Sequence, residues 1–214
     1  MLKIKSFEFS PIQENTYVLY NEFNDCIIID PGCYFDEEKD RLVAFIEEKQ
    51  LKPAMLINTH CHLDHVFGNK MLAEKYGLVL QLHKNEEAVL QFAPASGLMY
   101  SMPFDNYTGE FIFINEGDII TLGEDEIKVL FTPGHSPGSL SFFSEKDKFV
   151  ISGDALFKNS IGRTDLPGGD HDVLIKSIKE KLLVLPDETK VYSGHGPVTT
   201  VGEERRGNPF LNDR

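Results

Sequence analysis

Apolar and polar positions alternate at the start of the chain in the way that is typical of a β-strand. Lys3–Phe9 carries this pattern, Thr16–Tyr20 is a second predicted strand, and the apolar run Cys26–Ile29, closed by Asp30-Pro31-Gly32, is a third. The segment Asp36–Gln50 is predicted to be a helix, because acidic residues fill its first turn and Leu42 and Ile46 recur at helical spacing. A short apolar strand, Ala54–Asn58, follows it.

The rest of the first half alternates helices with strands, and the second half consists mainly of strands. The predicted elements are helix Val66–Tyr76, strand Leu78–Leu82, a short helix near Lys84–Phe92, strands Phe111–Ile114, Ile119–Leu122, Ile127–Phe131, Leu140–Ser144 and Phe149–Ser152, helix His171–Leu183 and strand Val191–Ser193. A long irregular segment, Ala93–Gly109, separates the two halves. Because strands followed by a helix occur twice, the pattern predicts an α/β fold of two stacked sheets with helices outside. We expect one domain, 1–214.

The composition is that of a globular protein with a strong excess of acidic residues. The chain has 34 Asp and Glu against 21 Lys and Arg, a formal net charge of -13. This charge argues against a nucleic-acid backbone or an anionic membrane as the main partner. No apolar run approaches the ~18–20 residues of a membrane span, the N-terminus has no apolar signal segment, and the three cysteines match no disulfide framework. We therefore expect a cytoplasmic protein without disulfides.

Three of the seven histidines fall within six residues, directly after a predicted strand. In extended backbone, residues i and i+2 point to the same side, so His60 and His62 can share one metal ion. Asp64 and His65 lie on the following turn, where they are free to face a second ion. Imidazole and carboxylate groups suit zinc and similar divalent ions. This segment therefore predicts a metal site.

Three more polar residues follow predicted strands in the second half. His135, Asp154 and His195 each lie close to glycine residues, and His135 and His195 also to prolines, of the kind that form tight turns. Loops held by a rigid scaffold commonly carry the residues of functional sites. Each residue alone would be an ordinary turn residue, but together with the first cluster they favour one shared site.

The segment His60-Cys-His-Leu-Asp-His65, followed by His135, Asp154 and His195, resembles the metallo-β-lactamase-fold superfamily. The resemblance implies a four-layer αβ/βα sandwich of two mixed sheets, with the site along one sheet edge. It also implies a binuclear centre holding two zinc ions, with iron or manganese as alternatives. The first ion would take His60, His62 and His135; the second would take Asp64, His65 and His195; Asp154 would bridge the two.

Within the superfamily, three segments are similar to the short bacterial, glyoxalase II-like hydroxyacylglutathione hydrolases: Ser152–Lys158, Ile161–Asp170 and Thr199–Phe210. This resemblance implies hydrolysis of a thioester such as S-lactoylglutathione by a metal-bridging hydroxide, which Asp64 would orient as the catalytic residue. A thioester suits such a site, because a thiol with a pKa of about 8.5 leaves readily as thiolate.

Two cations after Asp154 are candidates for binding a substrate carboxylate, namely Lys158 and Arg163. An internal ion pair between Arg163 and Asp165, with Lys158 solvated, is the alternative. The segment Ala93–Gly109 could overhang the site as a lid, because long irregular loops in compact domains are often functional.

Other functions on the same fold remain open. Persulfide dioxygenases share the fold and bind one iron, which here would take His60, His62, His135 and Asp154. An RNA-processing nuclease is disfavoured by the net charge of -13. A non-catalytic metal-binding protein is disfavoured because structural zinc sites are normally closed by four protein ligands. We expect a zinc-dependent enzyme that acts on a small-molecule thioester, with neither nucleic acid nor membrane as its partner.

Overall fold

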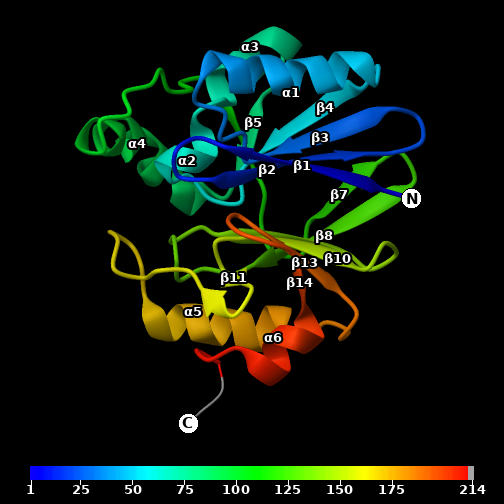
Figure 1. The fold of residues 1–214 in the computed structure, drawn as a ribbon, viewed down its shortest axis with the longest axis vertical. Helices are drawn as coiled ribbons and strands as arrows, with labels where there is room; N and C mark the ends of the chain where they lie inside the picture. The colour runs from blue at the N-terminus through cyan, green and yellow to red at the C-terminus, as the bar shows by residue number, and fades with distance from the viewer. Residues whose placement is uncertain (212–214) are drawn as a thin grey trace.

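The computed structural model describes residues 1–211, which form two six-stranded sheets stacked face to face (Figure 1). The first sheet has the order β1 (Lys3–Phe9), β2 (Glu14–Tyr20), β3 (Asp25–Ile29), β4 (Lys52–Ile57), β5 (Leu80–Leu82) and β6 (Phe111–Phe113). The second has the order β14 (Thr199–Thr200), β13 (Lys190–Ser193), β10 (Phe149–Gly153), β9 (Leu140–Ser144), β8 (Asp125–Phe131) and β7 (Ile119–Leu122). Both sheets are mixed, since parallel and antiparallel neighbours occur in each.

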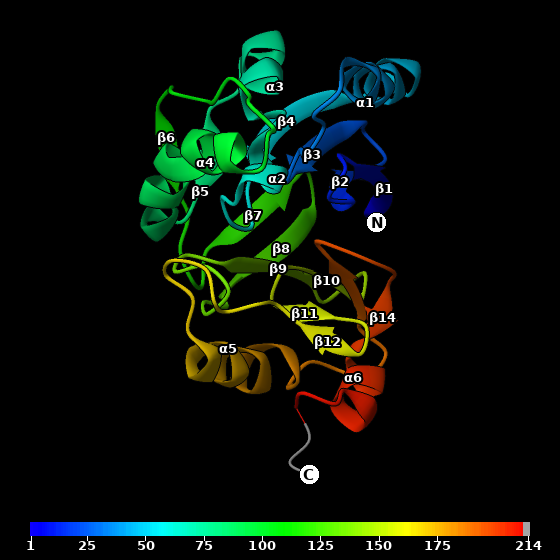
Figure 2. The same ribbon diagram turned by 60° about the vertical axis from the view of Figure 1, so that its left-hand side comes forward.

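Helices cover the outer face of each sheet (Figures 1 and 2). Those of the first half are α1 (Asp36–Glu48), α2 (Leu63–Val66), α3 (Asn69–Tyr76) and α4 (Glu87–Met99), which a 3-10 turn (Lys84–Glu86) precedes. Those of the second half are α5 (His171–Ser177), extended by a π-helical turn (Ile178–Leu182), and α6 (Val201–Gly207). A small hairpin of β11 (Leu156–Phe157) and β12 (Ser160–Ile161) follows β10. The predicted αβ/βα sandwich of two mixed sheets is confirmed.

Three apolar cores separate the four layers. Ile27 and Ile29 of β3 lie in the core between the sheets, together with Phe142 of the second sheet. Ile28 lies between them in sequence and belongs to the core under the helices, together with Leu42 of α1. The third core lies between the second sheet and α5 and α6. Because both faces of β3 are buried, its sequence is apolar throughout and does not alternate.

The prediction of irregular structure from Ala93 onward is wrong, because α4 continues through Pro94 to Met99. A proline inside a helix removes the hydrogen bond to the carbonyl four residues earlier. Here the freed carbonyl of Leu90 accepts a hydrogen bond from the Asn106 side-chain amide at 2.8 Å. A residue beyond the helix thus replaces the missing donor, which local sequence patterns do not reveal.

Two other predicted helices are interrupted. The predicted helix Val66–Tyr76 breaks between α2 and α3 at Gly68, whose N–H donates to the Pro31 carbonyl at 2.7 Å. The predicted helix His171–Leu183 changes to π-helical hydrogen bonding, in which Leu183 N–H donates to the Ile178 carbonyl at 2.8 Å. Both breaks depend on contacts that helical periodicity does not encode.

The structure shows the state of the three cysteines and the length and apolar character of the helices. Cys26, Cys33 and Cys61 are all free and buried, as expected for a chain without disulfides. Among residues 1–211, no helix has both the length and the apolar character needed to cross a membrane.

The contact between Asn106 and Leu90 gives a stability prediction. Asn106→Ala should lower the free energy of unfolding by about 1–3 kcal/mol, because a poorly hydrated carbonyl loses its donor. In a Pro94→Ala background residue 94 regains an N–H for this carbonyl, so the same change should cost less. Urea denaturation of the four proteins in a double-mutant cycle measures both costs. Equal costs in the two backgrounds would contradict this account of the helix.

Candidate metal centre

Every predicted ligand lies in a loop or short helix that begins where a strand ends. His60 and His62 follow β4, and Asp64 and His65 lie in α2. The other three come from the second sheet, in the segments after β8, β10 and β13: His135, Asp154 and His195. The isolated bridge between Glu14 and His195 joins the two halves at this edge. The sandwich therefore brings all seven residues together.

Three histidines converge on one point, as the family resemblance implies for the first ion. His62 Nδ1 lies 2.8 Å from His135 Nε2, which in turn lies 3.2 Å from His60 Nε2. One nitrogen from each ring lies within 4.8 Å of the others. A trigonal set of imidazole nitrogens is a common way to hold a divalent metal ion with positions left for other ligands.

The predicted second group also comes together. His195 Nε2 lies 3.2 Å from Asp64 Oδ2, and His65 Nε2 lies 3.8 Å from the same oxygen. These three side chains offer ligand atoms within 4.8 Å of one another.

Asp154 lies between the two groups. Its Oδ2 is 3.5 Å from His135 Nε2 of the first group and 3.5 Å from His195 Nε2 of the second. Its Oδ1 is 3.5 Å from His65 Nε2. One carboxylate therefore faces both candidate positions, which is the arrangement expected of a bridging ligand.

Polar atoms without partners show that the residues fit metal ions. Among the described residues, His65 Nε2 and Asp154 Oδ1 are buried and have no hydrogen-bond partner. Burial opposes ionisation of Asp154, but His65 and His195 outweigh it and hold the pKa of Asp154 well below its usual range. Burial likewise opposes a charge on His65, but Asp154 and Asp64 outweigh it and raise the pKa of His65. The second group and Asp154 thus favour positive charge, which divalent ions would supply.

The far nitrogens of the histidines fix the ring orientations. His65 Nδ1 donates to Asp30 Oδ2 at 3.1 Å, His135 Nδ1 donates to the Arg163 carbonyl at 2.7 Å, and His195 Nδ1 donates to the Gln13 carbonyl at 3.1 Å. Each bond uses Nδ1 as the donor, so Nε2 is the nitrogen that would be left to bind a metal ion at the centre. His62 differs, since its Nδ1 is the nitrogen that faces the other rings.

Asp30 is a supporting residue whose role the sequence analysis missed. Its Oδ1 accepts hydrogen bonds from Thr59 N–H at 2.7 Å and from the Asn58 amide at 3.3 Å. Its Oδ2 accepts from the Thr59 hydroxyl at 2.5 Å and from His65. Asp30, His60 and His65 also form a close group, but the Asp30 oxygens are occupied by these donors behind the rings. The Asp-Pro-Gly sequence at the end of β3 indicates only a turn, so no local signal marks this role.

Glu86 is a second missed residue, and it joins the two loops of the first histidine group. Its Oε2 accepts from Cys61 N–H at 2.8 Å, between His60 and His62. Its Oε1 accepts from the Ser136 hydroxyl and from Gly138 N–H, each at 2.6 Å, just after His135. The carboxylate is fully buried. Glu86 lies in the polar segment 84–87, a pattern typical of the exposed first turn of a helix, so the sequence does not predict that it is buried.

A cavity of about 480 Å³ opens onto the centre, and Asp64, Asp154 and Arg163 are among its lining residues. Arg163 makes two hydrogen bonds of 2.7 Å to Asp165, so the ion pair that the sequence left as an alternative is present. Lys158 is exposed and is not among the residues lining this cavity.

Two residues of the expected lid segment line the cavity beside the centre. They are Ser96, within α4, and Tyr100, at its end. Met102 instead packs with Leu63 and Phe67, and Tyr107 donates to the Glu110 carbonyl at 2.7 Å. Most of the segment after Ala93 is therefore helix or packed chain.

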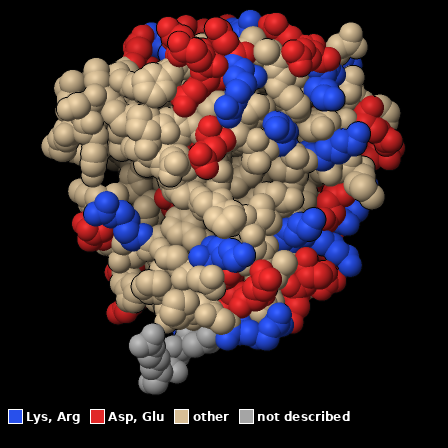
Figure 3. All heavy atoms as spheres, viewed as in Figure 1, with Lys and Arg blue, Asp and Glu red and all other residues tan. Residues whose placement is uncertain are grey.

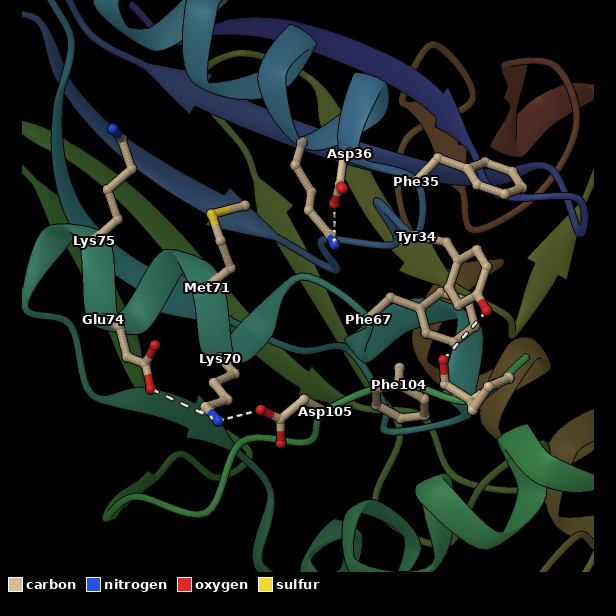
Figure 4. A pocket seen from close by; sticks show the side chains of 12 residues that line it. Tyr34, Phe35, Asp36, Phe67, Lys70, Met71, Glu74, Lys75, Phe104 and Asp105 are labelled. Carbon is tan, nitrogen blue, oxygen red and sulfur yellow. Dashed lines mark hydrogen bonds and ion pairs between the residues drawn. The ribbon is translucent and has the colours of Figure 1, made fainter.

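A larger cavity of about 890 Å³ lies elsewhere, between α1 and α3 (Figure 4). Its lysines are engaged by neighbouring acids, since Lys39 pairs with Asp36 and Lys70 with Asp105. None of the seven candidate ligands is among its lining residues. The histidine and carboxylate chemistry, and not cavity size, therefore locates the functional site.

The chain belongs to the metallo-beta-lactamase superfamily, whose family model matches residues 10–195. The probable metallo-hydrolase YqgX of Bacillus subtilis (strain 168) is 40% identical over 213 residues, covering 99% of this chain and 98% of the relative. The hydroxyacylglutathione hydrolase GloC of Haemophilus influenzae is 35% identical over 215 residues, covering 100% of both chains. The crystal structure of the BLEG-1 B3 metallo-beta-lactamase has a TM-score of 0.89 at 40% identity, covering 99% of this chain and 100% of that one. The chain is thus similar over its whole length to metallo-hydrolases, which supports an enzyme.

The bonds of Glu86 predict an effect on metal affinity. Glu86→Gln replaces one accepting oxygen by an amide group that faces an N–H donor, and so loosens the loops that carry His60, His62 and His135. Loss of such supporting contacts typically costs about 10–100-fold in metal affinity. Competition between the protein and a chromogenic chelator for zinc measures the loss. Glu87→Gln, at the neighbouring half-exposed position, is the matched control and should bind zinc like the parent. Unchanged zinc affinity in Glu86→Gln would contradict the role.

Proposed function

We propose that the protein is a thioester hydrolase with two zinc ions, the first held by His60, His62 and His135 and the second by Asp64, His65 and His195. Asp154 would contact both ions. When bound, the ions would supply a nucleophilic water near neutral pH and polarise a carbonyl oxygen. The observation that carries the proposal is that two three-residue groups share one carboxylate and face an open cavity.

Asp64 is the residue with which the chain itself would orient the attacking water. Burial opposes its ionisation, but His65 and a hydrogen bond from His195 outweigh it, and the pKa of Asp64 is lowered. Asp64 also lines the cavity, so its carboxylate can accept a hydrogen bond from water beside a bound substrate. The same carboxylate would hold that water toward the carbonyl carbon.

The leaving group is the reason for choosing a thioester. Among the described residues that line the cavity, the carboxyl groups are those of Asp64 and Asp154, and both are candidate ligands. No further carboxyl group among these residues is therefore free to protonate a leaving atom. A thiol of pKa about 8.5 leaves as thiolate without that help, whereas an amide nitrogen needs it. The relative GloC, a hydroxyacylglutathione hydrolase, supports the same choice.

Replacement of Asp64 tests the proposal. The zinc-loaded protein should release thiol from S-lactoylglutathione, and Asp64→Asn should lower kcat by at least about 100-fold, because the carboxylate no longer orients the water. A colorimetric thiol assay measures release, and metal analysis of each protein separates loss of chemistry from loss of zinc. Asp172→Asn, an exposed aspartate on α5, is the matched control and should keep full activity.

Three other activities define the outcomes that would overturn this assignment. Protein with two zinc ions that releases no thiol from S-lactoylglutathione or from an uncharged acetyl thioester is not a thioester hydrolase. Oxygen consumption with glutathione persulfide after iron loading would then favour the dioxygenase. Opening of a cephalosporin would favour a β-lactamase like BLEG-1. Salt-dependent RNA binding with cleavage would favour a nuclease.

A further inference from the structure

A second cavity of about 290 Å³ adjoins the metal centre. Four residues line both this cavity and the 480 Å³ cavity that opens onto Asp64 and Asp154, namely His62, Leu63, Ser96 and Leu166. A molecule whose reacting carbonyl lies at the centre could therefore extend past His62 into this second space.

The walls of the second cavity are almost entirely apolar. One wall is helix α4, which contributes Ala88, Val89 and Phe92, and the opposite wall includes Pro137 and Leu166. Among the described residues, neither lysine, arginine, aspartate nor glutamate lines it. Its amide side chain, Asn85, donates to the Pro137 carbonyl at 3.2 Å and is already engaged. A charged or strongly polar group would lose hydration here without compensation.

We propose that this cavity binds the acyl group of the thioester, and that the preferred substrates carry a short, unbranched apolar acyl chain. The inference rests on the thioester hydrolase proposed above. The volume of about 290 Å³ lies just below the range for drug-sized ligand cavities, about 300–1,000 Å³. It has room for a short alkyl chain but not for a peptide-sized thiol carrier, which would occupy the larger cavity.

The 480 Å³ cavity at the candidate metal centre also lacks a free cation for an anionic carrier. Among its described lining residues the sole lysine or arginine is Arg163, and Asp165 holds that guanidinium with two hydrogen bonds. The end of α4 beside this cavity is apolar and exposed at Leu98, Met99 and Tyr100. Figure 3 shows the same region as a surface without charged side chains. Selectivity should therefore come from the acyl chain more than from charges on the carrier.

A series of acyl thioesters of one uncharged carrier, N-acetylcysteamine, tests the inference. Burial of each added methylene should raise kcat/KM by about fourfold until the cavity is full, and longer chains should then lose activity. Ala88→Leu fills part of the cavity, so it should lower kcat/KM at least about tenfold for hexanoyl thioester while leaving the acetyl thioester within twofold. Ala95→Leu adds the same volume at another exposed position of α4, which lines neither cavity, and should keep the parental profile.

The outcomes separate this inference from the function on which it rests. Hydrolysis of all chain lengths at one rate, or an equal loss for acetyl and hexanoyl thioesters in Ala88→Leu, would overturn the acyl pocket and leave the hydrolase intact. Failure of the zinc-loaded parent to hydrolyse any member of the series would overturn the hydrolase, and the acyl pocket with it. A rise in kcat/KM with chain length up to a limit, removed in Ala88→Leu and kept in Ala95→Leu, would support both.

Discussion

The candidate metal centre brings five imidazoles and two carboxylates within a few ångströms of one another, and two buried carboxylates behind them make this arrangement possible. Asp30 holds the loop after β4 through Thr59 and also orients His65. Glu86 holds the same loop through Cys61 and ties it to the loop that carries His135. Each carboxylate accepts several hydrogen bonds, which offsets much of the cost of burial. Removing the Asp30 carboxylate would therefore leave buried donors unpaired in the segment after β4, and removing that of Glu86 would do so on both loops.

The sandwich explains why supports of this kind are needed. The ligand loops come from two separate sheets, and the apolar core between the sheets fixes only where each strand ends. A loop of several residues leaves a strand end with considerable freedom, whereas a ligand set needs each nitrogen placed within a few tenths of an ångström. Hydrogen bonds that cross from one loop to the other supply this last degree of order. The core positions the loops, and the buried carboxylates position the ligands.

The sequence predicts the layers and the cluster of ligands because both depend on local signals. Periodicity marks the strands, and the spacing of His60 and His62 places two ligands on one side of an extended segment. Asp30 and Glu86 escape such reasoning, because their partners are 25 to 52 residues away in sequence. Pro94 favours the wrong prediction that the helix ends at this point, because the side-chain hydrogen bond that replaces the missing N–H donor comes from Asn106, beyond the helix. Arg163 stayed ambiguous between a substrate ligand and a partner of Asp165, since a sequence shows the charge and not its neighbour.

Helix α4 connects the geometry of the centre with the choice of substrate. The turn at its start carries Glu86, which holds two ligand loops, and the next residues, Ala88 and Val89, line the apolar cavity beside His62. Its last turn leads to Tyr100, which lines the 480 Å³ cavity at the candidate metal centre. Helix α4 thus forms part of the walls of both cavities, and the turn before it holds the loops that carry the candidate ligands. A change of side chain on α4 can alter the size of the 290 Å³ cavity without moving the histidines. Glu86, in the turn before the helix, keeps the loops of His60, His62 and His135 in place. Families built on this plan could therefore change acyl preference through α4 while their ligand sets stay the same.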